Sequence, residues 1–282
     1  MILVFGKSGQ VATELARQAE VTALGRDDCD LMETGAAQAA IEAHRPDVVI
    51  NASAWTAVDK AETEEASARQ LNAHAPAEMA RACAARGLPF LHVSTDYVFD
   101  GGGTAPWCET DPVAPRNAYG RTKLEGEQAI RESGANALIL RTSWVFSAHG
   151  ANFVKTMLRL SETRDHLTIV ADQIGGPTPA TDIAATLLAC AARMRDGQPG
   201  GTYHYSGAPA VSWADFAREI FGQANRATTV EDIPTSAYPT PAARPLNSRL
   251  DCAKLATDFG INQPSWSEGL AAVLRDLGHD TA

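Results

Sequence analysis

The feature that most constrains this fold is an alternation of short apolar runs with longer, alanine-rich amphipathic stretches. Strands and helices that alternate in this way form a parallel sheet covered by helices. Most of the short runs are apolar throughout, as expected for strands that are buried on both faces. The expected strands are 2–5, 21–24, 48–51, 90–94, 138–142 and 168–170, and the expected helices are 11–18, 36–44, 66–86 and 119–133.

The composition bounds the class of protein. With 282 residues, 45% of them hydrophobic and 21% charged, the chain is long enough for one large α/β domain or for a domain with a smaller lobe. The net charge of −10 argues against a nucleic-acid partner and against an anionic membrane surface. No run approaches about 18 consecutive apolar residues, and the chain starts directly with the apolar run 1–5, without a basic leader.

The cysteines indicate the redox compartment. They are scattered and form no C-x-x-C pair: Cys29, Cys83, Cys108, Cys190 and Cys252. An odd, scattered set is typical of reduced thiols rather than of a disulfide framework or a zinc site. We therefore expect a soluble, cytoplasmic protein.

The chain changes character after about residue 150, where the alternation loosens. Before that point, residues 96–117 form an irregular stretch, and a loop this long inside a compact domain is usually functional. Further helices are expected at 152–163, 182–194, 213–223 and 267–277, with a proline-rich stretch at 234–245. We expect residues 1–150 to form a dinucleotide-binding core and residues 151–282 to form mainly a smaller substrate-binding lobe, with residues of about 165–195 returning to the core.

A turn with two glycines follows the first expected strand directly. Glycine is needed where the chain turns sharply or where backbone must approach a pyrophosphate, and the next helix offers its N-terminus to phosphate. The spacing G-x-x-G-x-x-A departs from G-x-G-x-x-G, so the position between strand and helix supports the prediction. We interpret Gly6, Ser8, Gly9, Gln10 and Val11 as cofactor-binding residues of a Rossmann-type, doubly wound parallel sheet. The alternative is an ordinary strand-to-helix turn.

The end of the second strand indicates which cofactor binds. An acidic residue there binds the ribose 2′-OH of NAD, whereas a basic residue meets the 2′-phosphate of NADP. Arg26 follows this strand and favours NADPH, while the acids at 27 and 28 keep NADH possible. Asp30 and Leu31 lie where a loop can flank the adenine, and the small residues at 52–54 let a cofactor lie close to the backbone.

Tyr119 and Lys123 are four residues apart, so their side chains leave the same face of a helix. An ammonium beside a phenol favours the phenolate and lowers the pKa of the phenol, which lets the tyrosine exchange a proton near neutral pH. The hydroxyl of Thr95, at the end of a buried strand, would complete a polar trio around a reacting carbonyl. The alternative is that this pair lies on a solvated helix face.

These segments together resemble the extended short-chain dehydrogenase/reductase superfamily and, within it, the family of dTDP-4-dehydrorhamnose reductases. The resemblance covers nearly the whole chain. It rests on FGKSGQV (5–11), WTAVDKAE (55–62), STDYVFDG (94–101) and YGRTKLEGE (119–127), with further support from RTSWVF (141–146), DQIGGPT (172–178) and RPLNSRLD (244–251). Each segment alone is a modest signal, but their order along the chain is a strong one.

The resemblance implies roles for single residues. The catalytic tyrosine and lysine of the family fall on Tyr119 and Lys123, and the accompanying hydroxyl falls on Thr95. Cofactor contacts fall on Gly6, Gly9, Gln10, Val11, Asp30, Leu31, Ser53, Ala54 and Thr56, besides Tyr119 and Lys123. Sugar-nucleotide contacts fall on Val58, Thr95, Asp96, Tyr119 and Trp144, and Arg244 is suited to the substrate pyrophosphate. Loop packing is the alternative for Asp96 and Trp144, and a surface arginine held by prolines is the alternative for Arg244.

Two departures from the family pattern stand out. Trp55 replaces a smaller aromatic residue and is expected to narrow the mouth near the cofactor. Some family members dimerise through Mg²⁺ held by glutamates from the first helix, a later helix and the C-terminus. Glu14 matches the first glutamate, but Ile183 lies near the second position and the tail 278–282 lacks the third. A magnesium-bridged dimer is therefore doubtful, and we expect a monomer or a weak homodimer.

The resemblance also implies a reaction. A nicotinamide hydride reduces the C4 ketone of dTDP-4-dehydro-6-deoxy-L-mannose to give dTDP-L-rhamnose, the last step of dTDP-L-rhamnose biosynthesis. Tyr119 is expected to supply the proton, Lys123 to lower the pKa of Tyr119 and hold the nicotinamide ribose, and Thr95 to orient the carbonyl. One alternative is a nucleotide-sugar epimerase or dehydratase, which keeps its NAD bound. Another is a non-catalytic regulatory subunit similar to the β-subunit of methionine adenosyltransferase, which could lose the trio without penalty.

Overall fold

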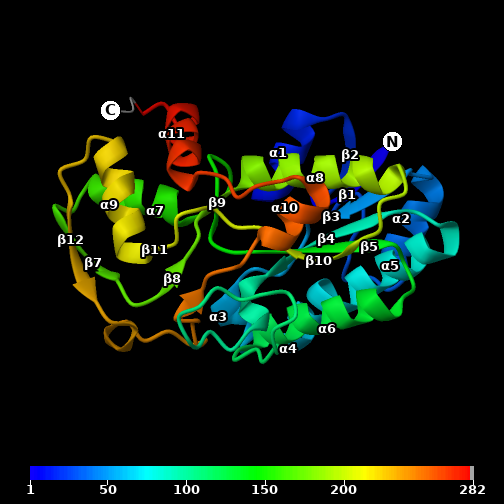
Figure 1. Ribbon diagram of the computed structural model, residues 1–282, viewed down its shortest axis with the longest axis horizontal. Coiled ribbons are helices and arrows are strands. Elements are labelled where there is room, and N and C mark those ends of the chain that lie inside the picture. Colours follow the sequence, from blue (N-terminus) through cyan, green and yellow to red (C-terminus); the bar gives the residue numbers. More distant parts are fainter. Residues whose placement is uncertain (280–282) are drawn as a thin grey trace.

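A six-stranded parallel sheet forms the centre of the fold, as seen in a computed structural model that describes residues 1–279 (Figure 1). The strand order is β10-β5-β4-β3-β1-β2, and every neighbouring pair is parallel. The strands are β1 (Ile2–Phe5), β2 (Val21–Leu24), β3 (Val48–Asn51), β4 (Phe90–Thr95), β5 (Ala137–Thr142) and β10 (Gly201–His204). From β1 the chain moves outward in both directions, which confirms the predicted doubly wound α/β fold.

Helices cover both faces of the sheet, because successive side chains of each strand point to opposite faces. On one face, Val4 and Ile50 pack with α1 (Gln10–Gln18), α8 (Ala180–Arg195) and α10 (Ala253–Phe259). On the other face, Leu3 and Val49 pack with α2 (Ala36–His44), α5 (Ala75–Arg86) and α6 (Ala118–Glu132). In Figure 1, α1 and α8 lie above the strands, and α5 and α6 lie below them.

The expected helix 66–86 is divided into three parts. These are α4 (Glu65–Arg69), the π-helical turn η1 (Gln70–His74) and α5. Pro76 follows the turn, and because proline has no backbone N–H the regular hydrogen-bond pattern cannot run through it. The short helices α3 (Val58–Ala61) and η2 (Asp96–Val98) lie in the loops after β3 and β4.

The structure corrects the predicted sheet. The run 168–170 does not join the main sheet: it belongs to β7 (His166–Val170), which pairs with β12 (Thr229–Ile233) in a separate two-stranded sheet. The sixth main strand is instead β10, which was not predicted because Gly-Thr-Tyr-His contains no apolar run. The helix α10 was also missed, because a helix of two turns shows too little periodicity.

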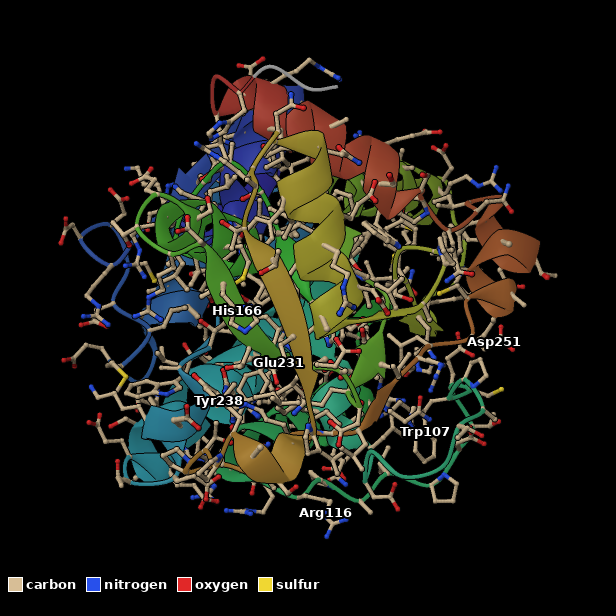
Figure 2. All side chains as sticks on the ribbon, turned by 90° about the vertical axis from the view of Figure 1, so that its left-hand side faces the viewer. Trp107, Arg116, His166, Glu231, Tyr238 and Asp251 are labelled. Atoms are coloured by element: carbon tan, nitrogen blue, oxygen red, sulfur yellow. The ribbon has the colours of Figure 1, made fainter. Side chains whose placement is uncertain are left out.

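A second group of elements forms the lobe at the left of Figure 1. Its apolar core joins α7 (Phe153–Ser161), α9 (Trp213–Gln223) and α11 (Trp266–Asp276) with β7. The lobe's outer sheet carries His166 and Glu231, which Figure 2 shows side by side and whose Nε2 and Oε2 atoms are 2.9 Å apart. The remaining short elements are β6 (Val145–Phe146), β8 (Ile174–Gly175), β9 (Thr178–Pro179), β11 (Val211–Ser212), η3 (Thr235–Ala237) and β13 (Asn247–Ser248).

The division into residues 1–150 and 151–282, with about 165–195 returning to the core, stays a prediction. Three elements after residue 150 lie with the main sheet: α8, β10 and α10. Among residues 1–279, none of the helices is both long enough and apolar enough to cross a lipid bilayer.

Glycine lets α6 approach η1 closely, which gives a test of the packing. A Cβ on Gly126 would lie 2.1 Å from the carbonyl oxygen of Asn72, so alanine there must push the helix away. We expect Gly126→Ala to lower the free energy of unfolding by about 1–3 kcal/mol, the usual cost of overpacking, measured by urea denaturation. The matched control is Gly222→Ala in α9, where a Cβ meets nothing within 4 Å and helix propensity favours alanine. Equal destabilisation by both substitutions would contradict this account.

Candidate active site

The glycine turn after β1 brings the backbone close to the end of β3. Gly6 has a φ of +112°, which side-chain-bearing residues rarely adopt, and a Cβ there would lie 3.2 Å from the carbonyl carbon and oxygen of Ala52. Gly9 is the N-cap residue of α1 and has no side chain to cover the free N–H groups of that helix. The N-terminus of α1 is therefore left open to an anion.

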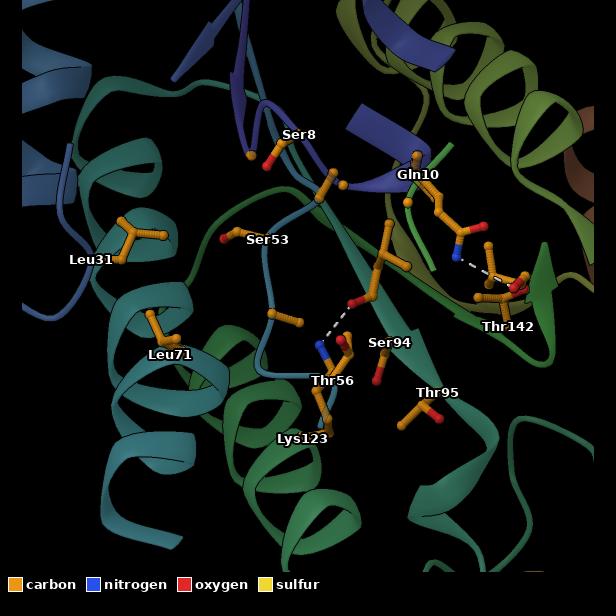
Figure 3. A pocket seen from close by; sticks show the side chains of 18 of the residues that line it. Ser8, Gln10, Leu31, Ser53, Thr56, Leu71, Ser94, Thr95, Lys123 and Thr142 are labelled. Carbon is orange, nitrogen blue, oxygen red and sulfur yellow. Dashed lines mark hydrogen bonds between the residues drawn. The ribbon is translucent and has the colours of Figure 1, made fainter. Parts of the chain in front are cut away.

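A cavity of about 680 Å³ lies along the carboxyl ends of β1, β3, β4 and β5. Ligands of open α/β sheets bind at this edge, next to the point where the strand order reverses. Figure 3 shows Ser8 and Gln10 at the start of α1 on one side of the cavity, and Thr95 and Lys123 on the other.

The cavity brings together nearly all of the predicted site residues. Every predicted cofactor residue lines it: Gly6, Ser8, Gly9, Gln10, Val11, Arg26, Asp30, Leu31, Ser53, Ala54, Thr56, Tyr119 and Lys123. Five of the predicted substrate residues line it as well: Val58, Thr95, Asp96, Tyr119 and Trp144. Arg244 and Glu14 do not.

Arg244 is bound elsewhere. Its Nη2 donates to Asp59 Oδ2 at 2.8 Å, and its Nη1 donates to the carbonyl oxygen of Ala242 at 3.2 Å. The side chain of Arg244 is therefore held by an ion pair with α3, and not only by packing against the neighbouring prolines.

Glu14, the predicted magnesium ligand, is buried on α1. Its Oε1 lies 2.8 Å from His149 Nε2 and 3.5 Å from Arg17 Nη1. Within residues 1–279, no three histidine, cysteine, aspartate or glutamate side chains are grouped as a metal site. The last three residues of the tail 278–282 lie outside the described residues, so the prediction about that tail stays open.

Tyr119 is placed by the start of α6. Asn117 caps this helix, because its Oδ1 accepts a hydrogen bond from the N–H of Gly120 at 2.8 Å. The first turn of α6 then directs the half-buried Tyr119 into the cavity, so the residue does not lie on a solvated helix face. Loss of solvent raises the pKa of the phenol to about 12, opposed by the nearby hydroxyl of Thr95.

Lys123 corrects the electrostatic prediction. Its Nζ donates to the carbonyl oxygen of Val93 at 2.8 Å and lies 3.0 Å from His92 Nε2. Burial lowers the pKa of this lysine to about 8, while Glu127 acts in the opposite direction. The expectation of a lowered phenol pKa is wrong for this structure, because burial is the largest influence on Tyr119 and raises its pKa.

Thr95 ends β4 at the cavity wall, and Asp96 begins η2 directly after it. Thr95 Oγ1 donates to Asp96 Oδ1 at 3.1 Å, whereas Asp96 Oδ2 is buried without a hydrogen-bond partner within residues 1–279. Burial raises the pKa of Asp96 to about 6. The hydroxyl of Ser248 is near enough to lower this pKa, although it forms no hydrogen bond of normal geometry with Oδ2.

Several lining residues were missed by the sequence reasoning. Thr142 ends β5 and Ser143 follows it, and the shared carboxyl edge of parallel strands was a usable signal for both. Leu71 gave no local signal, because the π-helical turn brings it to the cavity on the side of Leu31 (Figure 3). His92 does not line the cavity but contacts Lys123 from β4.

Comparison with known proteins agrees with this geometry. The chain matches the family model described as RmlD substrate binding domain over residues 1–279. A dTDP-4-dehydrorhamnose reductase from Sinorhizobium fredii is 45% identical over 278 residues, which cover 95% of this chain and 94% of that protein. Among solved structures, a dTDP-4-dehydrorhamnose reductase from Clostridium acetobutylicum has a TM-score of 0.92 and 36% identity, covering 98% of this chain and 99% of the other. The dTDP-4-dehydrorhamnose reductase from Bacillus anthracis in complex with NADP also has a TM-score of 0.92, with 32% identity and 98% coverage of both chains.

Fold and similarity together identify the family. The doubly wound sheet and the cavity at its carboxyl edge are of the short-chain dehydrogenase/reductase type. The chain belongs to the family described as RmlD substrate binding domain, whose match spans residues 1–279. This confirms the resemblance drawn from the sequence motifs.

The carboxyl of Asp96 gives a pH-dependent prediction. The pKa of Asp96 rises from 3.8 to about 6 on folding. The protonated carboxyl therefore contributes its full stabilisation of the fold below a pH of about 4, and this contribution is lost as the pH rises through about 6. Asp96→Asn stays neutral and is spared this loss. We expect the free energy of unfolding of Asp96→Asn minus that of the wild type to increase by about 2 kcal/mol from about pH 4.5 to about pH 7.5, measured by urea denaturation. A difference that does not change with pH would contradict the burial of this carboxyl.

Proposed function

We propose that this protein is an NADPH-dependent dTDP-4-dehydrorhamnose reductase, which reduces the C4 ketone of dTDP-4-dehydro-6-deoxy-L-mannose to dTDP-L-rhamnose. The observation that carries the proposal is that Thr95, Tyr119 and Lys123 line one cavity together with the glycine turn after β1. A non-catalytic subunit has no need of these groups in one place. The reductase name of the relative at 45% identity supports a reductase over an epimerase or dehydratase.

The cavity suits a nicotinamide dinucleotide by its own geometry. A Cβ on Gly6 would lie 3.2 Å from the Ala52 carbonyl, and the φ of +112° favours glycine there, so the turn brings backbone rather than a side chain to the N-terminus of α1, where a pyrophosphate can bind. Ser53 and Ala54 are small and line the cavity beyond that turn. When bound, NAD(P)H supplies the hydride that is added to C4 of the sugar. The solved relative from Bacillus anthracis in complex with NADP supports the same cofactor here.

Tyr119 acts as the general acid. As charge develops on the C4 oxygen, the phenol donates its proton to that oxygen. A pKa raised to about 12 keeps the phenol protonated at neutral pH, as a proton donor requires. The Thr95 hydroxyl hydrogen-bonds the same oxygen and orients it. Lys123 holds the ribose hydroxyls of the cofactor, and its ammonium stabilises the phenolate that remains after proton transfer.

The remaining cavity residues bind the sugar nucleotide. Val58, Asp96 and Trp144 contact the substrate beyond the catalytic trio. Trp144 is held in place by Trp213 of α9, whose ring stacks on it with centroids 3.6 Å apart. Arg244 is proposed to bind the pyrophosphate with the N–H donors that its contacts with Asp59 and Ala242 leave over. The monomer or weak homodimer and the cytoplasmic location stay predictions.

Replacing the proton donor tests the proposal. Tyr119→Phe removes only the hydroxyl, so NADPH binding is expected to stay nearly normal while kcat falls by about 10²–10⁴-fold. The measurement follows NADPH absorbance with the dTDP-4-ketosugar, and fluorescence titration gives cofactor affinity. Tyr203→Phe is the matched control. Tyr203 lies on β10, outside the cavity lining, and its hydroxyl donates to Asp258 at 3.0 Å. Wild-type turnover in Tyr119→Phe would refute the assignment.

Arg26 sets the preference for NADPH. It lines the cavity after β2 and makes no hydrogen bond or ion pair within residues 1–279, whereas Lys7 is bound to Asp28 at 3.0 Å. A charge-assisted contact with the 2′-phosphate is worth about 1.5–3 kcal/mol, so Arg26→Ala is expected to raise KM for NADPH by about 10–100-fold. KM for NADH serves as the internal control and is expected to stay nearly constant. An equal loss for both cofactors would exclude this role.

A further inference from the structure

A chain of polar side chains leads from the cavity wall to Lys123, and the mechanism above gives no role to its two inner members. It runs from Ser53 through Asn51 and His92 to Lys123, across the neighbouring strands β3 and β4. Asn51 and His92 have no exposed surface, and Lys123 is 1% exposed. In a buried chain each donor needs an acceptor, so the direction of one hydrogen bond fixes that of the next.

The orientation of the Asn51 amide is fixed by Ser53. The backbone N–H of Ser53 donates to Asn51 Oδ1 at 3.0 Å, and the Ser53 hydroxyl donates to the same oxygen at 2.6 Å. A backbone N–H can only donate, so the amide oxygen has to face Ser53. The amide NH₂ of Asn51 therefore points towards His92 Nδ1, which is 3.0 Å away.

This orientation selects the tautomer of His92. Nδ1 accepts the hydrogen bond from Asn51 and thus carries no proton. Burial holds the pKa of His92 well below its ordinary value, so the imidazole is neutral. A neutral imidazole with a bare Nδ1 carries its proton on Nε2. That N–H points at Lys123 Nζ, 3.0 Å away.

The contact with His92 therefore favours one protonation state of Lys123. An ammonium has three donors and no acceptor, so it cannot accept from Nε2–H, whereas the neutral amine can. The amine accepts from His92 and still donates to the carbonyl oxygen of Val93 at 2.8 Å. We infer that His92 is a positioning residue that stabilises the neutral amine of Lys123, and that Ser53 and Asn51 set the tautomer with which it does so.

Other groups around Lys123 do not replace this contact. Glu127, one turn further along α6, favours the ammonium, but its carboxylate is bound by Arg141 from β5 and by Arg131. Tyr119 of α6 and Asp96 of η2 line the cavity. The charged residues of α4 and the outer face of α6 pair with one another: Glu65, Arg69, Arg121 and Glu125. Within residues 1–279, His92 is the side chain that forms a hydrogen bond with Lys123 Nζ.

The consequence for turnover rests on the proposed function. There, the ammonium stabilises the Tyr119 phenolate, so kcat/KM falls as the pH rises and Lys123 loses its proton. Burial lowers the pKa of Lys123 to about 8. By the inference above, the contact with His92 acts in the same direction. His92 thus brings the alkaline limb of the pH profile closer to neutrality.

The tautomer is measured directly in wild-type protein, without reference to activity. In ¹⁵N NMR of protein labelled at the histidine ring nitrogens, we expect His92 to show a protonated Nε2 and a bare Nδ1. Its signal is identified by its loss in His92→Phe or, if that variant does not fold, by its change in Asn51→Asp. A proton on Nδ1, or an imidazolium near neutral pH, overturns the inference.

A nearly isosteric variant tests the coupling to Lys123. Asn51→Asp keeps an acceptor for Ser53 but offers a second one to His92, so the imidazole proton moves to Nδ1 and Nε2 accepts from the ammonium. We expect the alkaline limb of kcat/KM to move upward by about one pH unit. The matched control is Asn51→Asp in the His92→Phe background, where the shift is expected to disappear.

The outcomes separate this inference from the proposed function. Equal shifts in both backgrounds indicate a through-space charge effect and overturn the inference, as does the absence of a shift with His92 present. If the NMR shows Nε2–H but the protein reduces no ketosugar, the proposed function fails, and the assignment of the Lys123 amine stands on the tautomer alone.

Discussion

The arrangement of the site depends on one buried ion pair, which joins Glu127 of α6 to Arg141 of β5. Arg141 Nε and Nη2 donate to the two carboxylate oxygens at 2.9 and 2.7 Å, and Ser94 Oγ of β4 donates at 2.6 Å. A bidentate pair fixes geometry more than it adds stability, because both charges have lost their water. Since Ser94 and Arg141 lie on neighbouring strands, α6 is held in one register, with its first turn beside the end of β4.

Two glycines let α6 lie deep enough for burial to control the chemistry. A Cβ on Gly120 would meet the carbonyl oxygen of Tyr97 at 2.2 Å, and Gly126 makes the corresponding approach to η1. At this depth, loss of solvent raises the pKa of Tyr119 to about 12 and lowers that of Lys123 to about 8. Burial thus favours the neutral form of both groups, and it outweighs the lowering of the phenol's pKa that their spacing predicted.

Local patterns predicted the parts of the protein that depend on neighbours in sequence. The strands β1 to β5 and the turn at Gly6 were found because apolar runs and glycine spacing are local signals. Long-range contacts decided the rest. Arg244 is bound by Asp59, 185 residues away, and His92 gains its role from Asn51 on the next strand. Neither partner can be read from the residues beside it, and the edge strand β10 lacked the apolar run that marked the others.

The most direct test of the central claim is the stoichiometry of the wild-type reaction. The protein is incubated with dTDP-4-dehydro-6-deoxy-L-mannose and either NADPH or NADH, and both the absorbance of the reduced cofactor and the sugar product are followed. Because Thr95, Tyr119 and Lys123 share one cavity with the glycine turn, the account predicts one NADPH oxidised per ketosugar reduced, dTDP-L-rhamnose as product, and slower use of NADH. A sugar converted without net oxidation of either cofactor, or left unchanged with both, would contradict it.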